Sequence, residues 1–159
     1  MAPSSRKAGI AGRVIGDSLV IALQGLIILV FSLIIATNIR ITGIVPAILT
    51  GIILSIAFSS IGISMALKMG SQEGFQLIMN FLLMPLLFLS GAFYPIDTMP
   101  DWMKYLAYID PLTYAVDASR YFLIGFSKFS IFFDMVALAG LATVFLLVAM
   151  FLFERATIE

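Results

Sequence analysis

The sequence contains neither cysteine nor histidine among its 159 residues. Without cysteine it has no disulfide framework and no thiolate ligand for a metal. Without histidine, Ser-His and Cys-His catalysis, the zincin motif and His-ligated haem are excluded. We therefore expect no catalytic residue, no metal site and no cofactor bound by this chain.

Charged residues are also scarce, at 11% of the chain, and nine basic residues balance nine acidic ones. Soluble domains average about 25% charged and about 45–50% apolar residues, whereas this chain is 62% apolar with a mean hydropathy of +1.13. A soluble globule is therefore excluded, and so is disorder, which needs low hydrophobicity and high net charge. The zero net charge argues against a nucleic-acid partner, which favours a basic excess.

Four stretches lack charge over about the 20 residues that a helix needs to cross a bilayer core. They predict transmembrane cores at about 19–36, 45–67, 75–93 and 135–153. A charge at the bilayer centre costs at least about 2.5–3.5 kcal/mol, and every charged residue falls outside these cores. Four buried soluble helices would leave almost no chain to cover them, and barrel strands would alternate apolar and polar residues. The predicted fold is an all-α membrane protein with one transmembrane domain over residues 1–159.

The basic residues near the span ends set the expected orientation. Arg6, Lys7 and Arg13 cluster before the first span, and with this cluster included the two sides carry five and four Lys or Arg residues. With four spans, the two termini and the loop at 68–73 share one side. Because the first helix usually dominates orientation, we place both termini in the cytoplasm and the chain in the cytoplasmic membrane.

Several small or polar residues lie inside the predicted spans. Small residues follow nearly one face of the second span, where they let helices pack closely, and ordinary packing explains this face better than a substrate path. These small residues are Gly51, Ser55, Ser59, Gly62 and Ala66. Gln24 in the first span and Asn80 in the third need polar partners in hydrocarbon, and interhelical hydrogen bonds supply them at least as well as a ligand. Pro85 should kink the third span.

Two helix starts stand out between the third and fourth spans. Pro100 suits a first helical position, and Asp110 before Pro111 combines an N-cap with a proline at the next position. They predict short helices at about 100–109 and 111–125, the first with interfacial aromatics such as Trp102 and the second ending at Gly125. Asp117 and Arg120, three residues apart, should pair. We interpret the segment as two re-entrant helices at the outer interface, with an amphipathic surface loop as the alternative.

The same region carries the motifs of a known family. It contains Pro85-x-x-x-Leu89-Ser90-Gly91, then Met99-Pro100, then Pro111-Leu112-Thr113-Tyr114 with Asp117 and Arg120 downstream. With this pattern the chain resembles the membrane subunit of type-two ABC exporters, a drug-, lipid- and polysaccharide-exporting family that includes daunorubicin-resistance and nodulation export permeases. The likeness runs from Ala2 to the C-terminus. It departs at Asp110, where the family usually has asparagine, which also caps helices.

The resemblance implies a helical permease that pairs with a second permease, as a homo- or heterodimer, and with two ATPase subunits. ATP and Mg would bind those subunits, and this sequence has no Walker-type phosphate-binding run. The family's cytoplasmic coupling helix would map onto about 5–14, so Arg6, Lys7 and Arg13 are candidates for ATPase coupling. The family has six spans, so we expect either that another chain supplies the first two or that this is a shortened gene product.

The leading functional hypothesis is an ATP-driven export subunit for a hydrophobic or amphipathic drug, lipid or glycan. The alternative is a non-transporting assembly partner or a truncated permease remnant. A channel or secondary transporter would place ionisable residues at mid-membrane, and none lies there. An intramembrane enzyme would need histidine for serine or zinc chemistry, or an aspartate deep in a span, and the sequence has neither.

Topology supplies the first test. Reporter fusions after Arg40 and after Ser127 should report the outside, and a fusion after Lys68 should report the inside, because four spans with cytoplasmic termini place these points alternately. An outside signal at Lys68 would overturn the arrangement.

Overall fold

The computed structural model describes residues 3–35 and 38–155. These residues form helices and contain no strand, which confirms the predicted all-α class. The elements are α1 (Pro3–Ile35), η1 (Ile41–Gly43), α2 (Ile44–Ala66), α3 (Gln72–Leu89), η2 (Ile96–Thr98), α4 (Asp101–Ile109), α5 (Pro111–Ile124) and α6 (Ile131–Arg155).

Four of these helices are long and apolar enough to cross a membrane, which agrees with the four predicted spans. Their spanning stretches are Ile15–Ile34, Ile41–Ala66, Gln72–Leu89 and Ile131–Arg155. The third ends four residues before the predicted limit of 93, because Ser90 closes α3 and Gly91 adopts a left-handed backbone with φ of 78°. A left-handed residue is a common way to end a helix.

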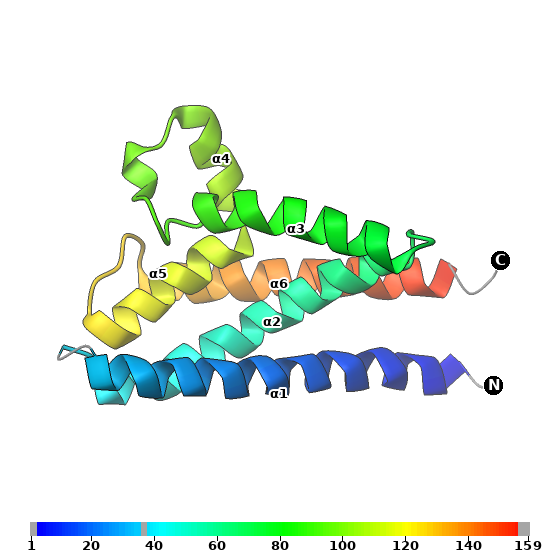
Figure 1. Cartoon of the computed structure of the whole chain (residues 1–159), viewed down its shortest axis with the longest axis horizontal. Helices are drawn as coiled ribbons and strands as arrows, with labels where there is room; N and C mark the ends of the chain where they lie inside the picture. The colour runs from blue at the N-terminus through cyan, green and yellow to red at the C-terminus, as the bar shows by residue number, and fades with distance from the viewer. Residues whose placement is uncertain (1–2, 36–37, 156–159) are drawn as a thin grey trace.

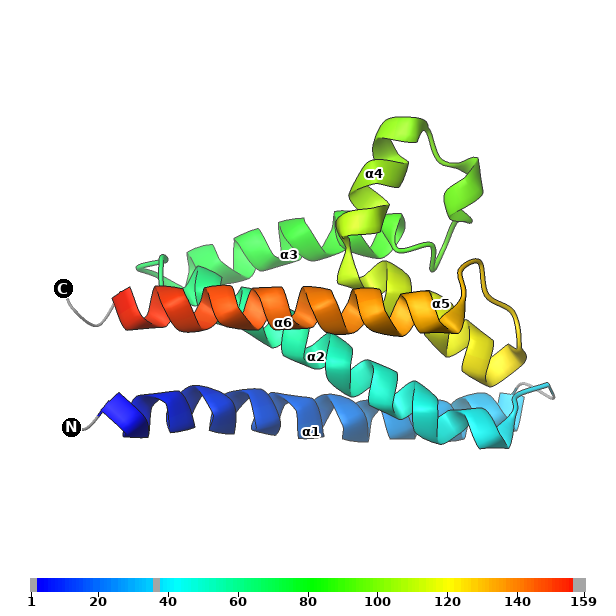
Figure 2. The same ribbon diagram turned by 180° about the vertical axis from the view of Figure 1, so that it is seen from behind.

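The long helices form a bundle with its chain ends together. The start of α1, the end of α6 and the α2–α3 turn lie at one end, here called the termini end (Figure 1). The α1–α2 and α5–α6 connections lie at the opposite end, here called the far end. From behind, α2 crosses the bundle obliquely between α1 and α6 (Figure 2), and the packing of α2 against both helices makes it the central element.

The expected cytoplasmic helix at about 5–14 is not a separate element. Residues 3–35 form one continuous helix of 33 residues, which is about 50 Å long at 1.5 Å per residue. An apolar bilayer core is about 30 Å thick. The first residues of α1 therefore extend the first span beyond the hydrocarbon instead of folding as an independent helix, since no proline follows Pro3 in α1 and the glycines there do not interrupt the helix.

Of the small residues predicted to pack closely, Ser55 and Ser59 of α2 contact α1, whereas a Cβ at Gly51 or Gly62 would meet nothing within 4 Å. Ser55 Oγ donates a 2.7 Å hydrogen bond to Ser18 Oγ, and Ser59 Oγ donates one of 2.8 Å to Asp17 Oδ2. Thr50, Ser55, Ala57 and Ser60 are buried along the same helix. Short side chains that bond across the interface allow two helices to approach closely in hydrocarbon.

A close backbone approach joins the start of α2 to the end of α5. The Arg40 N–H donates to the Leu123 carbonyl at 2.8 Å. Gly43 lies against this junction, and a Cβ atom there would collide with the carbonyl oxygen of Phe122. Gly125, with φ of 79°, ends α5 as its expected C-cap, and its own position is crowded by the Arg40 guanidinium.

The crowding at Gly43 predicts a stability change. Gly43→Ala should lower the free energy of unfolding by about 1–3 kcal/mol, the usual cost of overpacking, because the obstructing atoms are backbone and cannot rotate away. The measurement is thermal unfolding of the purified protein in detergent, followed by helical circular dichroism. Gly51→Ala is the matched control, since a Cβ at Gly51 meets nothing within 4 Å. Equal midpoints for the two variants would contradict the close approach.

Candidate functional site

The candidate site is built from the two short helices between α3 and α6, in the region that carries most of the motif residues. α4 has 9 residues and α5 has 14, and neither reaches the roughly 20 needed to cross a bilayer core. Their bounds confirm the two predicted helices. α5 packs against α2 and α6, whereas α4 projects from the side of the bundle (Figure 1).

The corner between α4 and α5 is organised by Asp110. Its Oδ1 accepts a 2.9 Å hydrogen bond from the Leu112 N–H, with Pro111 at the first helical position. This is the predicted cap. The side chain is 2% exposed, and burial raises the pKa of the Asp110 carboxyl from 3.8 to about 7. The second oxygen, Oδ2, has no hydrogen-bond partner among the described residues, so nothing besides the capped N–H compensates for the lost water.

The start of α4 differs slightly from the prediction. Pro100 occupies the N-cap instead of the first helical position, and its carbonyl accepts from the N–H groups of Met103 and Lys104. Trp102 and Tyr105 are 65% and 70% exposed. The helix thus presents amphipathic aromatic rings on its outer surface, the residue type that is enriched at the headgroup level of a membrane.

One face of α5 turns inward. Thr113, Tyr114 and Asp117 follow Asp110 at intervals that place them on one side of a helix, and all are buried. The Tyr114 hydroxyl donates to the Tyr108 carbonyl at 2.6 Å, which ties α5 back to α4. Its ring also packs with Phe129 of the α5–α6 loop and with Phe133 at the start of α6, and Phe129 in turn contacts Tyr108 of α4, so aromatic contacts join the three helices.

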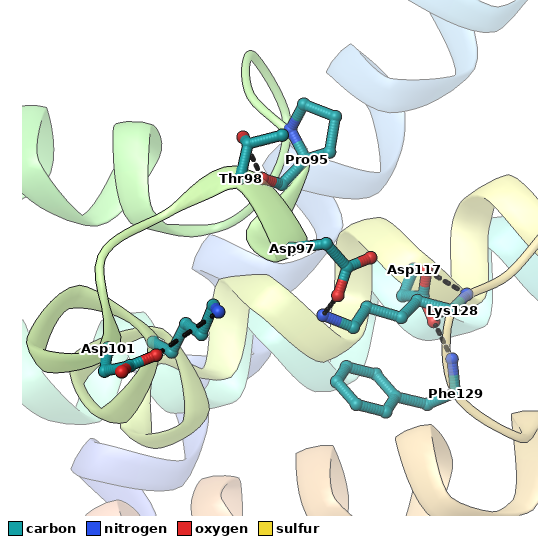
Figure 3. Close-up of polar contacts among 8 residues, drawn as sticks. Pro95, Asp97, Thr98, Asp101, Asp117, Lys128 and Phe129 are labelled. Atoms are coloured by element: carbon teal, nitrogen blue, oxygen red, sulfur yellow. Dashed lines mark hydrogen bonds and ion pairs between the residues drawn. The ribbon is translucent and has the colours of Figure 1, made fainter.

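Asp117 holds the loop between α5 and α6. The Lys128 N–H lies 2.9 Å from each of its oxygens, and the Phe129 N–H donates to Oδ2 at 2.8 Å. The Lys128 Nζ continues outward to the Asp97 carboxylate at 2.6 Å (Figure 3). The predicted pair of Asp117 with Arg120 is wrong, because the Asp117 carboxylate is fully engaged by backbone donors of this loop.

Arg120 bonds instead to the turn that follows α3. Its Nη2 donates to the carbonyl of Gly91 at 2.7 Å and to that of Ala92 at 3.3 Å. Ser90 is buried in the same turn, where its Oγ donates to the Leu87 carbonyl and accepts from the Ala92 N–H. Four predicted residues, Ser90, Gly91, Asp117 and Arg120, thereby line one cavity of about 380 Å³, together with Asp97 and Lys128.

Two further residues of this region, Lys128 and Asp134, are not predicted as site residues from the sequence. Asp134 is completely buried in the first turn of α6, and neither of its oxygens has a hydrogen-bond partner among the described residues. No sequence pattern predicts the contact between the Lys128 N–H and the Asp117 carboxylate, because the fold of the α5–α6 loop sets the distance between them.

The other predicted residues lie apart from this site. Gln24 and Asn80 are exposed and form no hydrogen bond within the described part of the chain, so the expected interhelical bonds are not found there. α3 continues through Pro85. Arg13 lies near the termini end, and the side chains of Arg6 and Lys7 lie outside the described residues.

Comparison with known proteins matches the chain to one family. The family model described as "ABC-2 type transporter" matches residues 1–124. The chain is 30% identical to the daunorubicin resistance ABC transporter permease protein DrrB1 of Streptomyces coeruleorubidus, over 96% of this chain and 55% of the relative. It is 24% identical to the inner membrane transport permease YadH of Escherichia coli K12, over 67% of this chain and 42% of the relative.

A shorter similarity links the chain to nodulation protein J of Rhizobium leguminosarum, with 32% identity over 46% of this chain and 28% of the relative. The chain thus spans about half the length of the first two relatives. None of the solved structures matches it.

The buried carboxyl at the α4–α5 corner predicts a pH dependence. The pKa of Asp110 is about 7 in the folded protein and 3.8 ordinarily, so between these values the folded state keeps a proton that the unfolded chain releases. The free energy of unfolding should therefore fall as the pH rises across this window. Asp110→Asn keeps the capping oxygen and cannot ionise, so its decline should be smaller.

Thermal unfolding in detergent at a series of pH values measures this effect. The Asn variant should match the wild type near the acid end and exceed it at about pH 8. Asp101→Asn is the control, because Asp101 is exposed at the start of α4 and its removal leaves the buried corner intact. If the wild type and the Asp110 variant decline in parallel, the carboxyl is not the source of the pH dependence.

Proposed function

The chain belongs to the ABC-2 type transporter family, and from this premise we propose that it is the membrane subunit of an ATP-driven exporter in the cytoplasmic membrane. Its cargo would be a hydrophobic or amphipathic molecule of the drug, lipid or glycan class. The observation that carries the proposal is the family match over residues 1–124. The two relatives similar over most of this chain are named as permeases, and four apolar helices fit that role.

The energy source would be two copies of a separate ATPase subunit that hold ATP and Mg. The sequence supports this division because it has no Walker-type run. The first twelve residues of α1 precede its spanning stretch, so they project about 18 Å at 1.5 Å per residue. Arg6 and Lys7 lie on this projection, with Arg13 nearer the membrane. We propose that the projection docks on the ATPase, which requires cytoplasmic termini.

A second permease chain would cover the exposed faces of α1 and α3. Only 6% of the spanning stretch of each helix is buried within the chain. Gln24 and Asn80 are exposed on these helices, and a polar side chain facing hydrocarbon lacks the partners that water would give it. A neighbouring membrane chain, including one that supplies two further spans, would provide such partners.

The short helices would cap the outer end of the export path. α5 is buried between α2 and α6, and irregular backbone at membrane depth is tolerated where protein covers it. The α4–α5 corner meets this condition because Asp110 and Tyr114 satisfy its backbone groups. These contacts support a re-entrant arrangement of α4 and α5.

Copurification from the native membrane tests the proposal. The chain should carry with it an ATPase that contains a Walker motif. Reversing both charges, Arg6→Glu with Lys7→Glu, should reduce the amount of that ATPase several-fold without changing the reporter-fusion topology, because the projection would then repel its acceptor surface. Arg155→Glu, at the same end of the bundle, is the matched control. A wild-type chain that copurifies with no ATPase would support the non-transporting alternative.

A further inference from the structure

A second, larger cavity lies at the termini end of the bundle, away from the site described above. Its volume is about 820 Å³, within the range of cavities that hold small ligands. It is enclosed by the start of α1, the last turns of α2, the α2–α3 turn and the end of α6. Its lining includes Arg13, Asp17, Ser59, Gly62, Phe75 and Phe153.

The lining is amphipathic. Phe75 and Phe153, with Ile63 and Leu67, make much of the wall apolar. The charged groups are on α1, where Arg13 and Asp17 stand one turn apart. The two side chains form no ion pair with each other, and the Asp17 carboxylate instead accepts from the Ser59 hydroxyl at 2.8 Å on the α2 side of the cavity.

Arg13 itself is exposed and has neither an ion pair nor a hydrogen bond among the described residues. The structure therefore presents an unpaired guanidinium beside an apolar wall. A guanidinium binds phosphate oxygens through two parallel hydrogen bonds, so the missing partner is an anion that also carries apolar surface.

The position of Arg13 identifies where such an anion would come from. Arg13 precedes the first residue of the apolar stretch, Ile15, by two positions, which places it at the level of the lipid headgroups. Basic residues at this level attract anionic lipids. The same cavity is lined by Ser71 and Gln72 at the start of α3, which add polar groups to this side of the lining.

We propose that this cavity binds an anionic phospholipid of the leaflet at the termini end, with Arg13 as the ligand of its phosphate and the Phe75–Phe153 side as the surface for its acyl region. This site goes beyond the proposed function, because it serves the chain whether or not an ATPase is attached. It also gives Arg13 a role different from that of Arg6 and Lys7.

Lipid retention tests the site directly. The purified chain is placed in nanodiscs of phosphatidylcholine with a minor fraction of phosphatidylglycerol, and the lipids retained are counted by native mass spectrometry. Phosphatidylglycerol should be enriched on the wild type. Arg13→Gln should lower the enrichment about five- to tenfold, the usual worth of one basic group or charge-assisted bond. Arg155→Gln removes a charge at the same end but outside the cavity, since Arg155 lies over the Phe151 ring, and it should retain the enrichment.

A second variant tests the cavity without changing any charge. A Cβ at Gly62 meets nothing within 4 Å, so Gly62→Leu should fold, fill the cavity and lower the enrichment to a similar extent. Arg13→Lys, which keeps the charge, should retain more of it than Arg13→Gln. Helical circular dichroism checks the folding of each variant. If Arg13→Gln does not fold, the lipid enrichment of Gly62→Leu tests the proposal in its place.

Four results would overturn the proposal. The first is a wild type without preference for phosphatidylglycerol, as expected if a protein segment covers the cavity. The second is equal behaviour of Arg13→Gln and Arg155→Gln, which would mean diffuse surface attraction. The third is an unchanged enrichment in Gly62→Leu. The fourth is complete displacement of the lipid by inorganic phosphate, which would assign the site to a free anion. No ATPase takes part, so these outcomes are independent of the proposed transport function.

Discussion

Hydrocarbon cannot satisfy a backbone N–H or carbonyl group, and this constraint governs the structure. The four long helices satisfy their backbone groups internally, so the difficult places are where the helices stop. At three such places near the short helices a side chain supplies the missing partner. Arg120 covers the carbonyls that follow α3, Asp110 caps the start of α5, and Asp117 takes the N–H groups that precede α6. The polar residues of this region thus serve first to let the chain turn inside the bundle.

The features that the sequence predicts correctly are those encoded within a few residues. Pro111 after Asp110, and Gly125 after an apolar run, indicate where α5 begins and ends because caps act over one turn. The partners of Asp117 were not predictable in this way. A spacing of three residues places Asp117 and Arg120 near each other on α5, but it does not say which neighbour competes for each side chain. Backbone donors of the α5–α6 loop, which no local pattern places, outcompete the guanidinium for Asp117.

The resemblance to type-two exporters separates two properties of Asp110, its capping oxygen and its ability to ionise. The motif that the chain resembles usually has asparagine at this position, and the hydrogen bond to Leu112 uses one oxygen that an amide also offers. The aspartate therefore preserves the cap and adds a titratable group in a buried corner. Gly43, in contrast, is required for a reason that no local sequence pattern indicates. A side chain does not fit there because the Phe122 carbonyl, nearly eighty positions away in the sequence, occupies the space.

The contacts around the α5–α6 loop differ greatly in how well water reaches them, and this difference sets which of them salt weakens. Asp117 is buried and bonded to fixed backbone donors, so α5, the loop and the start of α6 form a stiff unit. The link from Lys128 to Asp97 is exposed, with 75% of the Asp97 side chain in contact with solvent. Exposed ion pairs are worth about 0–1 kcal/mol and weaken with salt. Salt therefore weakens this one exposed tie, whereas η2 and α4 stay attached through the apolar packing of Ile96, Met99 and Ala107 against Leu89 and Phe129, which ionic strength does not loosen.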